Sequence, residues 1–217
     1  MLSQMRKKTK PFTYVLAKPF AMLNLHPNIV SFLAIPLILI AAYFIYAKSY
    51  LVALIFVLFA TMMDFIDGAV AELTKKQSHF GNYFETMIDK YVDFILIASF
   101  SFHYPVLSAI AIGLSMISSY AKPRAALVII ADNRDWPAIG EHADKLIIVM
   151  FFMLLASFSP KIFGTDTIEI MLWLLIIVTF IGGIQRIIYA KKLIEEAERK
   201  GKILPYLKKG AGHDAVE

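Results

Sequence analysis

Long apolar stretches alternate with short polar connections along the whole chain. A helix needs about 20 predominantly apolar residues to cross a bilayer. Backbone groups in lipid must be hydrogen-bonded within their own segment, so each stretch is predicted to be a helix. The second, fourth and fifth stretches are short, so each is expected to borrow flanking residues or to be buried by its neighbours. We therefore predict an all-α, polytopic membrane protein with six transmembrane helices, at residues 28–47, 50–63, 83–102, 105–120, 146–158 and 168–190.

Polar segments flank the predicted membrane part. In residues 1–26, basic positions alternate with aromatic and aliphatic ones, a pattern typical of an amphipathic segment that lies in the membrane interface on the cytoplasmic side. A disordered tail is the alternative interpretation. Residues 27–192 are predicted to form one six-helix membrane domain that carries the activity. Residues 193–217 are predicted to form a charged cytoplasmic tail.

The distribution of charge sets the predicted orientation. Of the 22 lysine and arginine residues, only Lys48 and Lys161 fall in the predicted outer connections. The positive-inside rule therefore places both termini in the cytoplasm. In a chain that is 59% hydrophobic, a net charge of +5 indicates contact with anionic lipid headgroups rather than nucleic acid. The chain has no cysteine, which excludes disulfides, thiolate metal sites and a cysteine nucleophile.

Acidic residues recur in register around the second cytoplasmic connection. Asp64 and Asp67 are three residues apart, and Glu85, Asp89 and Asp93 follow at steps of four. On helices these spacings place side chains on one face, so two helices joined by a short loop would bring the first four acids together. Converging carboxylates repel unless a cation holds them, and Mg²⁺ and Mn²⁺ prefer oxygen ligands. Helix capping is the alternative, but it does not explain repeated charge at the costly edge of a membrane span.

Residues around this acidic stretch are suited to a ligand. Gly68 and Gly81 frame the loop and have no side chain to block a ligand that approaches the backbone. Pro27 opens the first predicted span, and proline is well tolerated at a helix start. Asn28 follows it and is expected to cap this helix or, as the alternative, to turn toward a cytoplasmic ligand.

Cations stand beside apolar sequence near the same membrane face. Lys122 and Arg124 end the fourth stretch, and Arg186 interrupts the last one. Their long side chains could snorkel to the interface or anchor the helix end. Together with the acidic residues, they favour a pocket that holds a metal on one side and a phosphate on the other.

The acidic stretch resembles the CDP-alcohol phosphotransferase family, whose motif is D-x2-D-G-x2-A-R-x8-G-x3-D-x3-D. All spacings hold, and two residue types differ. Glu72 stands where the motif has arginine, and Glu85 stands where it has the third aspartate. The corresponding positions in this chain are Asp64, Asp67, Gly68, Ala71, Glu72, Gly81, Glu85 and Asp89.

The resemblance implies a homodimer of six-helix protomers in the cell membrane, with a cytoplasmic active site that displaces CMP from a CDP-linked lipid by an alcohol. It implies that Asp64, Asp67 and Glu85 bind two divalent ions, Mg²⁺ or Mn²⁺. It implies that Asp89 is both a metal ligand and the catalytic base. The implied CDP-binding residues are Asn28, Asp67, Gly68, Ala71, Glu72 and Gly81.

The acceptor is predicted from a second resemblance. Residues 120–125 read YAKPRA and are similar to the Y-x-K-x-R-A sequence of the branch that makes phosphatidylinositol phosphate and its archaeal ether-lipid equivalent. In that branch Lys122, Arg124 and Arg186 would bind the phosphate of a phosphorylated polyol, and inositol 1-phosphate is the predicted acceptor. The alternatives are glycerol 3-phosphate or serine as acceptor, CDP-inositol as donor, a catalytically silent membrane subunit and a cation transporter.

Overall fold

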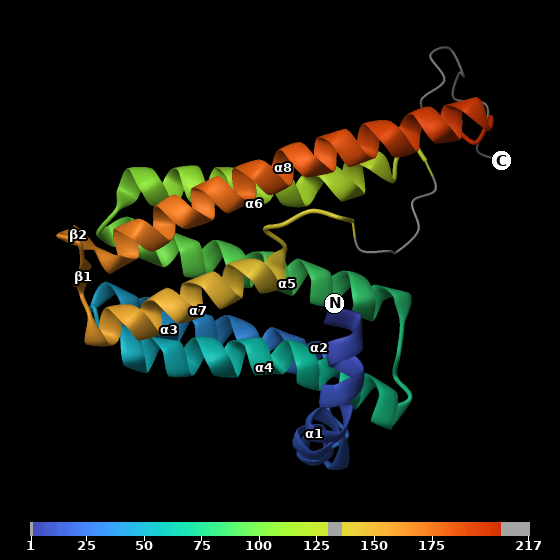
Figure 1. Ribbon diagram of the computed structural model, residues 1–217. Helices are drawn as coiled ribbons and strands as arrows, with labels where there is room; N and C mark the ends of the chain where they lie inside the picture. Colours follow the sequence, from blue (N-terminus) through green and yellow to red (C-terminus); the bar gives the residue numbers. More distant parts are fainter. Residues whose placement is uncertain (1, 130–135, 205–217) are drawn as a thin grey trace.

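The computed structural model describes residues 2–129 and 136–204, with side chains from Phe12 onward. The second half of the predicted tail, beginning at residue 205, and Arg134 lie outside the described residues. Helices make up nearly all of the regular structure (Figure 1). They are α1 (Leu2–Met22), α2 (Pro27–Phe32), α3 (Ala34–Tyr46), α4 (Tyr50–Thr74), α5 (His79–Ser99), the 3₁₀ turn η1 (Phe100–Phe102), α6 (Pro105–Ala125), α7 (His142–Phe158) and α8 (Thr167–Arg199).

The prediction of an all-α fold is confirmed, and each predicted stretch coincides with a helix. α4 continues beyond its predicted end at Met63 as far as Thr74, so it carries the first two acids of the motif. Within the described ranges, four segments are long and apolar enough to cross a membrane: α2 with α3, α4, α6 and α8. α5 carries several charged residues and α7 has only 17 residues, so neither meets those criteria. The total of six transmembrane helices therefore remains a prediction.

The first membrane segment is divided at Leu33, between α2 and α3. Pro36 explains the division, because proline has no N–H to donate to the carbonyl of Phe32 and its ring crowds that carbonyl. At the start of α2, the ring of His26 accepts a hydrogen bond from the backbone N–H of Asn28 at 3.3 Å. The expectation that Asn28 caps the helix is therefore wrong. Pro27 occupies the first helical position, which leaves His26 as the cap.

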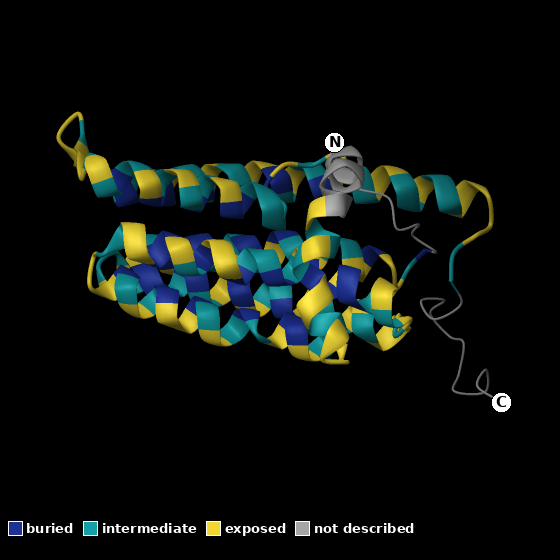
Figure 2. Cartoon of the chain, turned by 90° about the horizontal axis from the view of Figure 1, so that it is seen from below, coloured by how far each residue is buried: buried dark blue, intermediate teal, exposed yellow. Residues whose placement is uncertain are grey.

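The helices form two groups that Figure 1 separates clearly. α6 and α8 run alongside each other on one side, and α2 to α5 with α7 form the other group. α1 lies at the end of this second group, against α4. Buried residues face inward between the helices and many outward positions are exposed (Figure 2). Many exposed side chains are large and apolar, among them Phe59, Ile147 and Trp173, as expected for helices surrounded by lipid.

A short antiparallel hairpin joins α7 to α8. Its strands are β1 (Lys161–Ile162) and β2 (Thr165–Asp166). Phe163 and Gly164 both have positive φ, which matches the twist that tight two-residue hairpins need. The sequence analysis did not predict this hairpin, because a turn of this size leaves no extended apolar pattern.

Candidate active site

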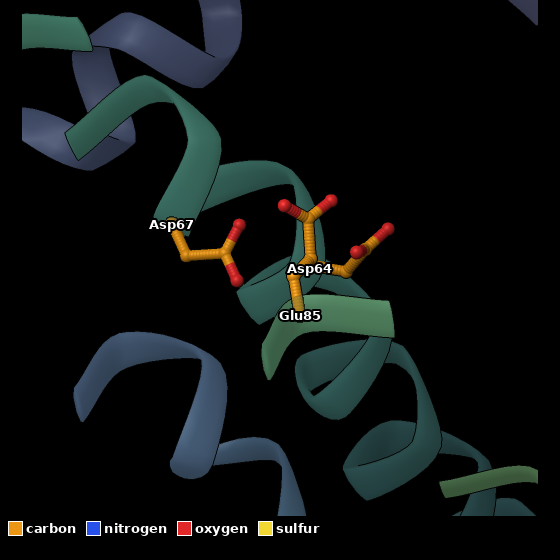
Figure 3. Close-up of side chains that lie close together, drawn as sticks. All are labelled: Asp64, Asp67 and Glu85. Atoms are coloured by element: carbon orange, nitrogen blue, oxygen red, sulfur yellow. The ribbon is translucent and has the colours of Figure 1, made fainter. Parts of the chain in front are cut away.

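Two adjacent helices bring three acids of the motif together. Asp64 and Asp67 come from α4 and Glu85 comes from α5. One carboxylate oxygen of each lies within 4.8 Å of the others, and the three side chains converge in Figure 3. The connection is compact because Lys75 ends α4 in a left-handed conformation. Ser78 then caps α5 by accepting a hydrogen bond from the N–H of Gly81 at 2.9 Å.

Asp67 has an incompletely satisfied carboxylate. Its side chain is 2% exposed, and its Oδ2 accepts a hydrogen bond from the hydroxyl of Ser31 on α2. Its Oδ1 is buried and has no hydrogen-bond donor among the described residues. A buried carboxylate oxygen without a partner is costly, and a cation bound between the three acids would remove that cost. The all-oxygen donor set fits a hard divalent ion such as Mg²⁺ or Mn²⁺.

Asp89 lies beside this cluster. It lines a cavity of about 10 Å³ together with Asp64, Asp67 and Glu85. A volume of this size admits about one water-sized sphere. The structure therefore brings the four motif acids around one small space, and the three-acid group that converges within 4.8 Å does not include Asp89.

A larger cavity of about 240 Å³ opens next to the acids. Five of the six residues predicted to bind CDP line it, namely Asn28, Asp67, Gly68, Ala71 and Gly81. Gly68 leaves open space where a Cβ would be, so the backbone of α4 forms part of the cavity wall. Its size approaches that of common small-ligand sites. Glu72, the sixth residue, is exposed on α4 and does not line this cavity.

A buried charged network adjoins the acids and was missed by the sequence analysis. Asp93 is 1% exposed, and its two oxygens contact His142 Nδ1 at 2.8 Å and the ammonium of Lys145. Lys145 also donates to Ser115 Oγ at 2.7 Å. The other ring nitrogen of His142 lies 3.8 Å from an oxygen of Asp89. The spacing of three residues between His142 and Lys145 signals one helix face, but only the fold brings Asp93 to that face.

The three cations predicted to bind phosphate have different surroundings. Arg186 is 7% exposed, and its Nη1 donates to Ser118 Oγ at 2.7 Å and to the carbonyl of Ile139 at 3.0 Å. Its Nη2 lies 3.6 Å from Glu141. Lys122 is half-buried one turn after Ser118, so it follows the face of α6 that meets Arg186. Arg124 is exposed on a different face of α6. None of the three lines either cavity.

Together these features describe a helical membrane protein in which three acids that could hold a metal ion lie beside a cavity of about 240 Å³. The family model described as CDP-alcohol phosphatidyltransferase matches residues 24–190. The chain therefore belongs to the CDP-alcohol phosphatidyltransferase family, whose members are transferases of phospholipid synthesis.

Similar proteins agree with this assignment. An archaetidylinositol phosphate synthase of Pyrococcus horikoshii is 28% identical over 90% of this chain and 99% of its own length. The fold is similar to that of a phosphatidylinositol phosphate synthase of Mycobacterium tuberculosis solved with CDP-DAG bound, with a TM-score of 0.70 and 22% identity over 82% of this chain and 92% of the other. The same enzyme solved with manganese and citrate gives the same TM-score and identity, and the match covers 82% and 88% of the two chains.

Proposed function

We propose that this protein transfers a phosphatidyl or archaetidyl group from a CDP-linked lipid to inositol 1-phosphate and releases CMP. The observation that carries the proposal is the convergence of Asp64, Asp67 and Glu85 within 4.8 Å at the edge of a 240 Å³ cavity. The relatives support the choice of substrates, because one is an archaetidylinositol phosphate synthase and another was solved with CDP-DAG.

The acids would hold two divalent ions, Mg²⁺ or Mn²⁺, with Asp64, Asp67, Glu85 and Asp89 as ligands. When bound, such ions neutralise the diphosphate and the charge that develops on the leaving CMP. The chain itself orients these ligands. Ser31 fixes one oxygen of Asp67 and leaves the other directed into the buried site.

Asp89 is assigned the role of base. The acceptor hydroxyl gives its proton to the carboxylate of Asp89. At the same time the hydroxyl oxygen forms a bond to the lipid-linked phosphorus. The bond between that phosphorus and the CMP oxygen breaks, and CMP leaves with the electron pair. His142, 3.8 Å from Asp89, is held by Asp93 and so keeps a fixed polar group beside the base.

The phosphate of the acceptor is assigned to Lys122, Arg124 and Arg186. Arg186 is already oriented by Ser118 and Ile139, which reduces the entropy lost when its fork contacts a phosphate. In this proposal Arg186 gives a fixed contact from α8, and Lys122 and Arg124 add two further positive charges from α6.

The protein is further proposed to act as a homodimer in the cell membrane. Six spans would place both termini and the active site on the cytoplasmic side, in keeping with the positive charge of the cytoplasmic segments. α5 is the decisive helix, because its acids Glu85, Asp89 and Asp93 face the acidic cluster and the buried network rather than lipid.

The deciding experiment measures CMP release by purified protein with CDP-archaeol or CDP-diacylglycerol. Inositol 1-phosphate, glycerol 3-phosphate, serine and inositol are compared as acceptors, each with Mg²⁺, Mn²⁺ or EDTA. We expect release only with metal and inositol 1-phosphate, and loss of that release in Asp89→Asn. Release with a different acceptor would keep the family chemistry and overturn the acceptor. No release with any acceptor would overturn the proposed activity.

The acceptor site has its own test. Arg124→Ala should raise the KM for inositol 1-phosphate by about tenfold or more, because a charge-assisted contact to phosphate is lost. The KM for the CDP-lipid should not change. Arg199→Ala, at the exposed end of α8, removes the same charge away from the site and serves as the control. An unchanged acceptor KM in Arg124→Ala would remove this residue from the site.

A further inference from the structure

Among the described residues that line the 240 Å³ cavity, Lys76 is the one cation. The acids Asp67 and Glu85 line the same cavity. Glu72 replaces the arginine of the family motif, and it is exposed outside this lining. The cavity therefore has carboxylates at one part of its wall and the positive charge of Lys76 at another.

The ammonium of Lys76 is fixed by neutral groups. Its Nζ donates to the backbone carbonyl of Asn24 at 3.0 Å and to the Oδ1 of Asn24 at 2.7 Å. Asn24 lies in the turn between α1 and α2, with a φ of 52°. Within the described part of the chain Lys76 forms no ion pair, so both contacts hold its position and leave its charge available. A lysine ammonium has three donors, which leaves one for a ligand.

The position of Lys76 suits a diphosphate. It directly follows Lys75, whose left-handed conformation ends α4 and turns the chain toward the cavity. Asn28 and Gly81 complete the cavity near the start of α5, and the Oδ1 of Asn28 lies 3.5 Å from where a Cβ at Gly81 would be. A ligand that extends from the acidic cluster into this cavity would reach Lys76, the one cation in the described part of its lining. A compact ammonium is a common partner for phosphate oxygens.

We propose that Lys76 binds a phosphate of the CDP-linked donor and supplies the positive charge that Glu72 does not. This inference rests on the proposed function, because it assumes that the cavity takes the nucleotide of that donor. The competing explanation is that Lys76 only ties the end of α4 to the turn that contains Asn24.

The test is binding of free CDP to the purified full-length protein in the presence of Mn²⁺, measured by calorimetry. Lys76→Gln should weaken CDP binding by about tenfold or more, as expected when one charge-assisted contact is lost. Lys75→Gln removes the same charge from the neighbouring exposed residue and should leave the affinity unchanged. Lys76→Arg keeps the charge and should retain most of the affinity.

Asn24→Gly separates the two explanations, because it removes the side-chain contact to Lys76 while glycine keeps the positive φ. We expect it to weaken CDP binding much less than Lys76→Gln does. Equal weakening in both variants would show that the contact between Lys76 and Asn24 is what affects CDP binding, and would overturn the proposal. Unchanged CDP affinity in Lys76→Gln would also overturn it. If the unaltered protein bound no CDP, the proposed function itself would fail.

Discussion

The two charged regions of this protein differ in how far the protein itself satisfies their charges. At the α4–α5 cluster, carboxylates of Asp64, Asp67 and Glu85 lie close together. A buried oxygen of Asp67 has no donor among the described residues. In the network between α5, α6 and α7, the buried carboxylate of Asp93 is matched by Lys145 and His142. The described residues thus leave one carboxylate oxygen of Asp67 without a donor, whereas they pair both carboxylate oxygens of Asp93.

This difference distinguishes a candidate ion-binding site, the α4–α5 cluster, from a network around Asp93 that holds helices together. Buried charges persist in a fold only when something compensates them. Lys145 on α7 pairs with Asp93 and thereby ties the first turn of α7 to α5. Asp93 also holds His142, whose other ring nitrogen lies 3.8 Å from Asp89, so the network around Asp93 positions a side chain beside the acidic cluster. Variants in the two regions should therefore change different quantities.

The largest effect is expected from Lys145→Met, which leaves the buried carboxylate of Asp93 without its cation. The free energy of unfolding should fall by about 3–5 kcal/mol, as is usual when one partner of a buried pair is removed. Thermal unfolding in detergent without added metal measures this. Lys161→Met, on the exposed hairpin, is the control and should change little. A stable Lys145→Met protein would mean that the network does not support the fold.

An intermediate effect is expected from metal at the α4–α5 cluster. Mn²⁺ at about 100 times its dissociation constant should stabilise the protein by about 2.7 kcal/mol. Asp67→Asn should abolish this stabilisation without lowering the stability of the metal-free protein, because the unpartnered charge is removed. Glu195→Gln changes an exposed acid of α8 and should leave the metal response intact. Equal responses in all three proteins would place the metal elsewhere.

A smaller effect is expected from Gly182→Ala. A Cβ at Gly182 would lie 2.0 Å from the carbonyl oxygen of Ile139 and 3.0 Å from Arg186 Nη1. The loop before α7 would have to move, at a cost of about 1–3 kcal/mol. At Gly183 the nearest atom to a Cβ is 3.9 Å away, so Gly183→Ala is a matched control. Equal stability of the two variants would contradict the close contact between this loop and α8.

Much of the fold could be predicted from the hydrophobic pattern. Apolar stretches of this length have few alternatives to helices, and each predicted stretch coincides with one. α5 contains several charged residues and α7 is short, so length and composition do not identify these two helices as membrane spans. The small hairpin before α8 was missed, since two-residue strands carry too little pattern.

The part of the site that depends on regular spacing was predicted, and the part that depends on long-range contacts was not. Regular spacing predicted that Asp64, Asp67, Glu85 and Asp89 would come together, and all four line one small cavity. Lys76 and His142 were not singled out. Lys76 reaches Asn24 across a gap of 52 residues, and His142 reaches Asp93 across 49. No local spacing encodes such contacts.

The helices and the register of the motif acids could be read from the chain alone, because both follow from periodicity within a single segment. Which buried carboxylate receives a partner depends on the fold. Asp93 and Asp67 are both buried acids near the same site, yet Lys145 compensates one and no described donor reaches the second oxygen of the other. That distinction depends on which helices pack together, since a buried charge is stabilised only by groups that the fold brings within a few ångströms.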